Sequence, residues 1–236
     1  MAKKSKLYRA QLEKFEKLRP YSLAEAFKLL KEMPHVKFDQ TVELSFKLGV
    51  DPKQTDQTVR GAVPLPKGTG KKVSIVVIAD DEKPRQEAQE AGADFVGFDD
   101  IIARIKEGWV DFDVLIATPS AMSQVRPLGR QLGPKGLMPN PKTGTVTDKV
   151  GNAVKEARAG RVEFRADKGA CVQVPVGKLS FPIEDLSANT EAVIKALIKA
   201  KPASAKGVYI QTFTISSTMS PGIKVDPREA VMKETS

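Results

Sequence analysis

Val73-Ser74-Ile75-Val76-Val77-Ile78-Ala79 forms a nearly continuous apolar run in the middle of a 236-residue chain. A strand that is covered on both faces has this composition, because helices on either side of a parallel sheet leave neither face in water. A second run of this kind, Asp113-Val114-Leu115-Ile116-Ala117-Thr118, follows further along. The two runs predict buried strands of one parallel sheet.

The segment between these runs supplies the connections that a parallel sheet needs. We expect helices over residues 84–91 and 100–107, separated by a short strand within Gly92-Ala93-Asp94-Phe95-Val96-Gly97. Strand, helix, strand, helix and strand in this order are typical of a parallel α/β unit. The middle of the chain is therefore predicted to be a Rossmann-like α/β domain.

Outside this region the apolar residues follow other periods. Residues 21–33 have the spacing of a helix that Ser22 caps and Pro34 stops. From Thr41 to Leu48 apolar and polar residues alternate, which predicts a strand with one buried face. Alternation returns at positions 162, 164 and 166 and at 172, 174 and 176, and a helix at 189–200 and a strand at 208–215 follow.

Each outer segment is too small to bury an adequate core by itself. We therefore predict one discontinuous α+β domain, residues 1–66 with 159–236, into which the α/β domain, residues 67–158, is inserted. The two crossings between the domains are expected to form a hinge.

The net charge of +9 indicates a nucleic-acid partner. Residues 1–66 and 159–236 together hold 24 Lys and Arg against 16 Asp and Glu, whereas residues 67–158 hold 14 against 13. The excess positive charge therefore lies in the discontinuous domain, which is expected to bind the nucleic acid.

The compartment is predicted from the N-terminus and the cysteine content. The basic start, Met1 to Lys6, is followed by an expected amphipathic helix from Tyr8 and not by the apolar core of a signal peptide. No apolar run approaches the roughly 18 residues that a membrane span requires. Cys171 is the single cysteine, which excludes an internal disulfide and fits a reducing compartment. We expect a cytoplasmic protein without a membrane partner.

The residues that catalysis uses are scarce. His35 is the only histidine and is interpreted as a helix-end residue, while Cys171 is interpreted as a small buried strand residue. Together they supply no metal-ligand cluster of the usual spacing. Residues 80–113 hold 11 acids against 4 bases, scattered over helices and turns, and are interpreted as a solvated acidic face. The sequence predicts no cofactor and no enzyme.

A nucleotide-dependent α/β enzyme built on residues 67–158 is the enzymatic alternative. Gly68-Thr69-Gly70-Lys71-Lys72 lacks both the earlier glycine and the following Ser or Thr of a phosphate-binding loop. It also precedes a strand, whereas such a loop follows a strand and opens a helix. We interpret it as a turn between the domains.

The segment from Arg126 to Thr145 is unusual in composition. Its 20 residues contain four Gly, four Pro and four basic residues but no acid. We expect no regular structure here, and long loops in compact domains are commonly functional. Two interpretations stay open at this point: a rigid, proline-braced connection at the domain boundary, or a loop that contacts phosphates.

Two further segments lie at predicted strand ends. Lys37-Phe38-Asp39-Gln40-Thr41 enters the first strand, and Ser216-Ser217-Thr218-Met219-Ser220-Pro221-Gly222 follows the last. One interpretation is a plain strand entry and a polar turn. The other is an RNA contact, because proteins recognise RNA by stacking and by contacts to 2′-hydroxyl groups.

Four motifs resemble a known family: residues 57–61 (Gln-Thr-Val-Arg-Gly), 132–142, 206–209 and 217–219. The second, Leu132-Gly133-Pro134-Lys135-Gly136-Leu137-Met138-Pro139-Asn140-Pro141-Lys142, is the most specific. The chain resembles the universal large-subunit ribosomal proteins, the L-one family, which form the mobile stalk beside the tRNA exit site. The resemblance extends from about Lys6 to Asp226.

The resemblance implies a split domain that binds large-subunit rRNA directly, with an inserted domain and a hinge. It implies a stalk that moves with deacylated tRNA and assists its release, and, in bacterial members, repression of translation of the protein's own operon mRNA. The residues on which it places RNA binding are Lys37, Phe38, Thr41, Thr212, Ser217, Thr218, Met219 and Ser220. Possible secondary RNA or hinge contacts are Arg126, Arg130, Lys135 and Lys142.

Position 220 departs from the family, which usually has Gly where this chain has Ser. If that Gly supports a positive φ or a close backbone approach, Ser220 is expected to weaken or reshape the contact. Ser220→Gly is then expected to be neutral or to strengthen binding. The alternative function is a free-standing RNA-binding regulator with a secondary ribosomal role, and a plastid is the alternative to a bacterial source.

Overall fold

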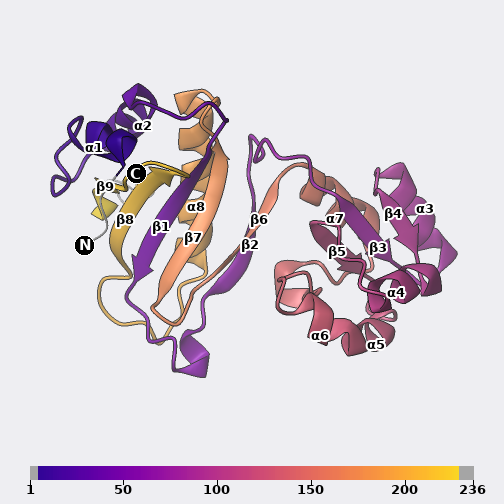
Figure 1. Cartoon of the computed structure of the whole chain (residues 1–236). Coiled ribbons are helices and arrows are strands. Elements are labelled where there is room, and N and C mark those ends of the chain that lie inside the picture. Colours follow the sequence, from indigo (N-terminus) through magenta and orange to yellow (C-terminus); the bar gives the residue numbers. More distant parts are fainter. Residues whose placement is uncertain (1–4, 229–236) are drawn as a thin grey trace. The chain divides into compact units, whose positions relative to one another are not determined.

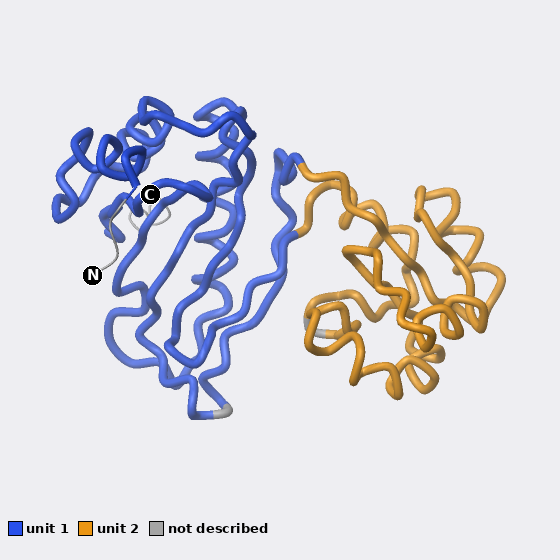
Figure 2. Tube along the Cα trace, viewed as in Figure 1, with its two compact units in different colours: residues 1–70, 162–236 blue, residues 71–161 orange. Residues whose placement is uncertain are grey.

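The computed structural model describes residues 5–228, apart from the side chains of Thr55 and Lys142. The chain divides into two compact units (Figure 2): unit 1 comprises residues 1–70 and 162–236, and unit 2 comprises residues 71–161. Each unit has its own strands and helices (Figure 1). Each also has its own buried clusters of apolar residues.

Unit 1 is built on a four-stranded antiparallel sheet. Its helices and strands are α1 (Lys6–Leu12), α2 (Leu23–Glu32), β1 (Thr41–Leu48), β2 (Arg60–Pro64), β6 (Arg161–Arg165), β7 (Cys171–Lys178), α8 (Ile183–Lys199), β8 (Ile210–Ser217) and β9 (Ile223–Val225). The strand order is β7-β1-β8-β9, and β2 pairs with β6 in a separate two-stranded sheet. β6 begins at Arg161, the last residue of unit 2.

One face of the four-stranded sheet forms the core of unit 1. Along β1, Val42, Leu44, Phe46 and Leu48 are buried while the residues between them are partly or fully exposed. The predicted half-buried strand is therefore confirmed. Phe46 lies opposite Phe213 of β8, and the two rings stack with centroids 4.6 Å apart. The buried residues of α2 and α8 belong to the same cluster, so these helices cover this face and leave the other open.

The helix predicted over residues 21–33 is confirmed as α2. Ser22 Oγ accepts from the backbone N–H of Glu25, and the Glu25 carboxylate accepts from the backbone N–H of Ser22, a reciprocal capping box. α8 begins six residues before its predicted start at 189. Glu184 and Asp185 in its first turn favour this earlier start, because acidic groups stabilise a helix N-terminus.

Unit 2 is built on a three-stranded parallel sheet. Its helices and strands are β3 (Ile75–Ile78), α3 (Glu82–Glu90), β4 (Phe95–Gly97), α4 (Asp99–Lys106), β5 (Val114–Ala117), α5 (Met122–Val125), α6 (Gly129–Leu132) and α7 (Val150–Arg158). The order is β4-β3-β5, and both pairs are parallel, as predicted.

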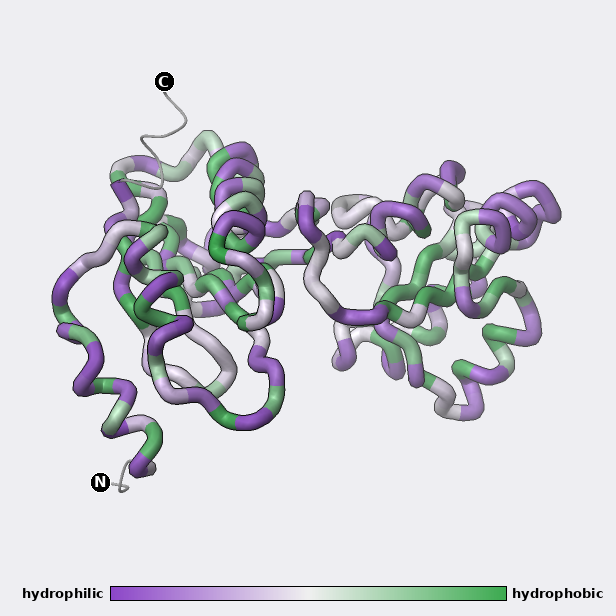
Figure 3. The backbone as a smooth tube through the Cα atoms, turned by 90° about the horizontal axis from the view of Figure 1, so that it is seen from above, coloured by the Kyte–Doolittle hydropathy of each residue, from purple (hydrophilic) through white to green (hydrophobic). Residues whose placement is uncertain are grey.

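The sheet of unit 2 is covered on both faces. Ile75 and Val77 of β3 share a buried cluster with residues of α3 and α7, whereas Val76 and Ile78 share another with residues of α4, α5 and α6. Burial on both faces explains why the sequence of β3 is a continuous apolar run. Figure 3 shows hydrophobic segments in both units. The mixed α/β and α+β fold class is confirmed.

The prediction that residues 126–145 hold no regular structure is wrong in part. Arg126–Leu128 and Pro141–Thr143 form 3₁₀ turns, and α6 lies within the segment. Pro127 is tolerated because it stands in a first helical turn, where its missing N–H is not needed. Leu128 and Leu132, four residues apart, are both buried and hold this short helical stretch on unit 2.

The contacts of the two crossings decide where the units divide. Asn189 of α8 is fully buried; its Oδ1 accepts from Lys67 N at 3.0 Å and its Nδ2 donates to Gly68 O at 2.9 Å. Arg161 Nη1 donates to Glu156 of α7 at 2.5 Å. The divisions therefore fall after residues 70 and 161, whereas the predicted ones follow residues 66 and 158.

Candidate RNA interface

The two predicted strand-end segments lie side by side in unit 1. Thr41 begins β1 and Thr218 directly follows β8, and the antiparallel register pairs Val42 with Ser217. Thr41 N donates to Thr218 Oγ1 at 3.2 Å, and Thr218 N donates to Thr41 O at 3.1 Å. Segments separated by 177 residues thus meet at one end of the sheet, where β1 begins and β8 ends.

The buried side chain of Gln40 joins these two segments. Its side chain is fully buried, and Oε1 accepts from Ser217 Oγ at 2.8 Å and from Met219 N at 2.9 Å. Ser220 closes the same turn: Ser217 N donates to Ser220 Oγ at 2.8 Å, and Ser220 N donates to Ser217 O at 3.0 Å. The turn from Ser217 to Ser220 is therefore held by bonds within the protein.

Ser220 does not require the freedom of glycine. Ala170 is the only non-glycine residue with a positive φ among residues 5–228, so Ser220 has an ordinary backbone. Its hydroxyl also fills a hydrogen-bonding role that Gly cannot fill. The positive-φ reason for expecting a weaker contact at Ser220 therefore does not apply to this chain.

The surface at these strand ends combines apolar side chains with cations. Phe38 is 53% exposed and Met219 is 49% exposed, so two large apolar side chains are open to solvent at these strand ends. Lys37 is exposed, and Lys178 at the end of β7 donates through Nζ to Thr41 Oγ1 at 3.0 Å. Asp39, the acid of this segment, accepts from the backbone N–H and the hydroxyl of Ser180. We call Lys37, Phe38, Thr41, Lys178, Thr218 and Met219 the strand-end surface.

Comparison with known proteins decides the family. Residues 30–221 match the model of the ribosomal protein L1p/L10e family. The chain belongs to this family. The large ribosomal subunit protein uL1 of Chlamydia pneumoniae is 54% identical over 229 residues, covering 97% of this chain and 98% of its own. That of Chlamydia caviae is 55% identical over 229 residues, with the same coverage.

Membership of the L1p/L10e family confirms the resemblance drawn from the motifs. It also confirms that the chain is not an enzyme, because this family consists of ribosomal proteins. Within residues 5–228 no helix has the length and apolar character to cross a membrane. Both similar proteins are bacterial.

Thr212 lies away from the other residues of the predicted RNA site. It pairs with Lys47 near the far end of β1, five residues along β8 from Ser217. A strand rises about 3.4 Å per residue, so roughly 17 Å separates Thr212 from the strand-end surface. Thr212 is exposed, and Thr214 and Ser216 continue its alternation along β8. A ligand that contacts both ends must run along the open face of the sheet.

The predicted secondary contacts lie on unit 2. Arg126, Arg130 and Lys135 are exposed, whereas the side chain of Lys142 lies outside the described part of the chain. Arg126 and Arg130 are four residues apart on one helical stretch and therefore share a face. Residues 114–147 contain no Asp or Glu, so no acid of this segment offsets these charges.

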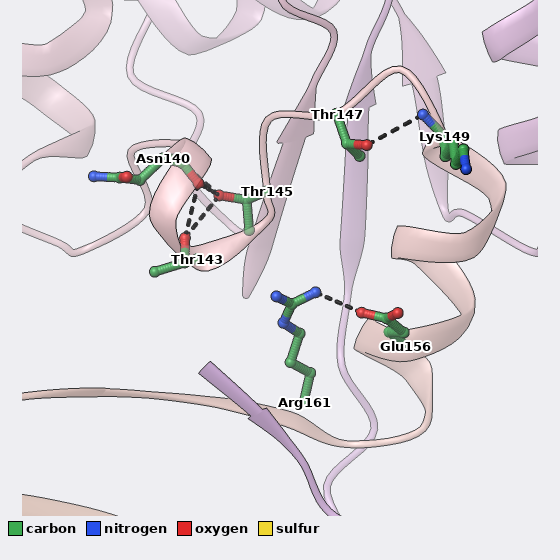
Figure 4. A network of polar contacts seen from close by, with 7 residues as sticks. All are labelled: Asn140, Thr143, Thr145, Thr147, Lys149, Glu156 and Arg161. Carbon is green, nitrogen blue, oxygen red and sulfur yellow. Dashed lines mark hydrogen bonds and ion pairs between the residues drawn. The ribbon is translucent and has the colours of Figure 1, made fainter. Parts of the chain in front are cut away.

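Hydrogen bonds of threonine hydroxyl groups stabilise the loop over residues 140–145, which follows this helical stretch (Figure 4). Asn140 O accepts from Thr143 Oγ1 at 3.1 Å and from Thr145 Oγ1 at 3.2 Å, and Asn140 N donates to Thr145 Oγ1 at 2.8 Å. The guanidinium group of Arg161 lies against Gly144, where a Cβ atom would come within 2.5 Å of Nη2. The loop is thus a braced connection, and these bracing bonds do not involve Arg126, Arg130 or Lys135.

The strand ends of unit 2 hold a polar cluster where α/β proteins commonly bind ligands. Asp80 accepts from Ser120 Oγ at 2.8 Å and from Thr118 Oγ1 at 3.3 Å. The Ser120 hydrogen bond lowers the pKa of Asp80 below its usual value. Within the described residues, no three His, Cys, Asp or Glu side chains are grouped to hold a metal ion. The cluster is explained by its own hydrogen bonds.

Sequence reasoning missed Gln40 and Lys178 as parts of the site. Gln40 carries no distinctive local signal, and its burial depends on the turn after β8. Lys178 reaches Thr41 because β7 pairs with β1 in the register Thr41 to Lys178. The interpretation of Cys171 as a buried residue is wrong, because it stands at the open start of β7 and is only half-buried.

Proposed function

We propose that the chain is a constituent of the large ribosomal subunit and binds large-subunit rRNA directly through the strand-end surface. The observation that carries this proposal is the exposed pair Phe38 and Met219, which lie at the hydrogen-bonded ends of β1 and β8 together with Lys37 and Lys178. Aromatic stacking and cation–phosphate pairing are the general means of gripping unpaired or distorted RNA. Ser217 and Ser220 support the turn from within.

Further parts of the proposal rest on the family. The relatives named large ribosomal subunit protein uL1 support assembly into that subunit, and we propose a place on the ribosome in a bacterial cytoplasm. The mobile-stalk role, assisted release of deacylated tRNA from the exit site and repression of the chain's own operon mRNA are supported by the motif resemblance. If one surface serves rRNA and mRNA, the two RNAs compete for it.

Truncating the apolar pair tests the rRNA proposal. Phe38→Ala is expected to weaken binding of an rRNA stalk fragment about tenfold or more, because stacking on an aromatic ring contributes about 1–3 kcal/mol per base. Met219→Ala is expected to weaken it several-fold, because the variant buries less apolar surface against the RNA. Leu18→Ala is the matched control: Leu18 is 81% exposed in the same unit but lies outside the strand-end surface. Equal binding by all three variants and the parent would remove the strand-end surface from the proposal.

Co-sedimentation separates the ribosomal role from the free-standing regulator. A ribosomal constituent is expected to travel with large subunits in moderate salt. A regulator whose ribosomal role is secondary is expected to dissociate from them while it still binds its mRNA fold. Family membership favours the first outcome.

A further inference from the structure

Gln40 occupies an unusual place for a polar side chain. It is fully buried at the entry to β1, and its contacts reach three neighbouring segments. Its backbone carbonyl accepts from Leu179 N at 2.8 Å, just beyond β7. Its side-chain oxygen accepts from Ser217 Oγ and Met219 N in the turn after β8. One residue therefore ties the ends of β7, β1 and β8 together.

The orientation of the carboxamide follows from its partners. A backbone N–H only donates, so the atom that faces Met219 N at 2.9 Å must be the oxygen. Nε2 then points elsewhere, and it is buried without a hydrogen-bond partner within the described residues. A buried unpaired donor is destabilising. Such groups in native proteins call for an explanation beyond stability.

The position of the turn suggests that explanation. Met219 carries one of the two exposed apolar side chains of the strand-end surface, and its backbone is fixed by Gln40. Thr218, between Ser217 and Met219, is fixed to Thr41 from the other side. Without the Gln40 oxygen, the Met219 N–H and the Ser217 hydroxyl would both be left without their acceptor. The turn would then sample other conformations before RNA arrives.

We propose that Gln40 is a positioning residue that pre-organises the Ser217–Ser220 turn for RNA. The inference rests on the rRNA-binding function proposed above. Gln40 acts through Met219 and Ser217 and makes no RNA contact of its own, since its side chain is buried beneath them. A surface fixed before binding does not lose its conformational freedom on binding, and this is how pre-organisation raises affinity.

One substitution at position 40 and one at position 217 separate positioning from packing. Gln40→Met keeps the length of the side chain but removes the acceptor. Ser217→Ala removes only one of the two bonds to Oε1. The measurements are affinity for an rRNA stalk fragment, its salt dependence, hydrogen exchange of the Met219 amide and thermal unfolding without RNA.

Gln40→Met is expected to bind RNA about tenfold more weakly, with a faster-exchanging Met219 amide. The slope of affinity against salt is expected to stay that of the parent, because the number of neutralised phosphates does not change. Ser217→Ala is expected to have an affinity between that of Gln40→Met and that of the parent. Thr190→Val is the control: it removes a buried hydrogen bond to Leu186 O inside α8, so it lowers stability without altering affinity.

Parent-like affinity of Gln40→Met, or loss of affinity in Thr190→Val that matches its loss of stability, overturns the inference. If Gln40→Met does not fold, Ser217→Ala decides, since unchanged affinity there also overturns it. Failure of the parent itself to bind the fragment refutes the proposed function instead, so the two failures are distinguishable.

Discussion

The two units use their sheets in opposite ways. Unit 1 has an antiparallel sheet that is covered on one face by α2 and α8, so its other face and its strand ends carry polar and exposed residues. Unit 2 has a parallel sheet that is covered on both faces, and its strand-end polar groups bond to one another. An open face leaves room for a ligand, whereas a doubly covered sheet exposes only its loops.

The two units also differ in their balance of positive and negative residues. Unit 1 contains 24 Lys and Arg against 16 Asp and Glu, and unit 2 contains 14 against 13. Within unit 2 the signs are segregated, because residues 80–113 hold 11 acids and residues 114–147 hold none. Unit 1 is thus expected to dominate RNA affinity, and unit 2 to add a local contribution from its acid-free segment.

Separating the units should have the largest effect. A protein that joins residues 1–70 to 162–236 through a short linker is expected to fold and to retain most rRNA affinity. The isolated residues 71–161 are expected to fold but to bind at least about a hundredfold more weakly, because they neutralise few phosphates. Titration of each protein with an rRNA stalk fragment measures the difference. Strong specific binding by unit 2 alone would reverse the comparison.

Thr218→Val should have the next largest effect. The substitution removes the exposed Thr218 hydroxyl, and we expect rRNA binding about tenfold weaker, because an RNA group left unpaired costs roughly 1–3 kcal/mol. It also removes the acceptor for Thr41 N. The melting temperature should change little, because the residue is exposed and water can replace the bond. If affinity falls only in proportion to stability, Thr218 is a structural residue and not a recognition residue.

Neutralising Arg126 and Arg130 tests the contribution of unit 2. The double change to Gln is expected to weaken binding several-fold and to reduce the salt slope by about 0.7 to 0.9 for each phosphate that is no longer neutralised. Arg104→Gln with Lys106→Gln on α4 is the matched control, since it removes the same charge from the acidic half of unit 2. Identical slopes for both double variants would assign unit 2 no specific RNA contact.

Ser220→Gly should have a smaller effect, opposite in sign to that expected from the family pattern alone. The Ser220 hydroxyl accepts from Ser217 N at 2.8 Å, so Gly leaves that N–H unpaired and frees the turn. We expect a loss of stability of about 1 kcal/mol and binding about two- to threefold weaker. Calorimetric unfolding and RNA titration measure both. Tighter binding would show that the turn needs freedom rather than bracing.

The smallest effect concerns acid stability of unit 2. The hydrogen bond from Lys71, at 2.5 Å, lowers the pKa of Asp113 below its usual value. A lowered folded-state pKa adds stability above the unfolded value, and this is lost as pH falls through the folded-state pKa. As the pH falls from about 5 to about 2, the free energy of unfolding of residues 71–161 should therefore decrease. It should decrease less steeply in Asp113→Asn. The difference should be small because both side chains are partly exposed. If the free energy of unfolding depends on pH equally in the parent and in Asp113→Asn, the Lys71–Asp113 pair contributes nothing to acid stability.

Much of the fold is determined by local sequence. The apolar run at β3 indicates a doubly covered parallel strand because burial on both faces permits no polar alternation. The alternation at β1 indicates a half-buried strand, and Ser22 with Glu25 fixes the start of α2. The L1p/L10e motifs, above all residues 132–142, identify the family. Each of these patterns depends on residues that are close together in the sequence, so it can be recognised without the tertiary fold.

The candidate site is decided by tertiary structure. The resemblance predicts Lys37, Phe38, Thr41, Thr218 and Met219, but only strand pairing across 177 residues makes them one surface. The same pairing places Thr212 away from that surface, near the other end of β1. The same pairing buries Gln40, recruits Lys178 and gives Ser220 its bond to Ser217. A sequence pattern shows which face of a strand is buried, whereas the partner strand and its register depend on packing of the whole core.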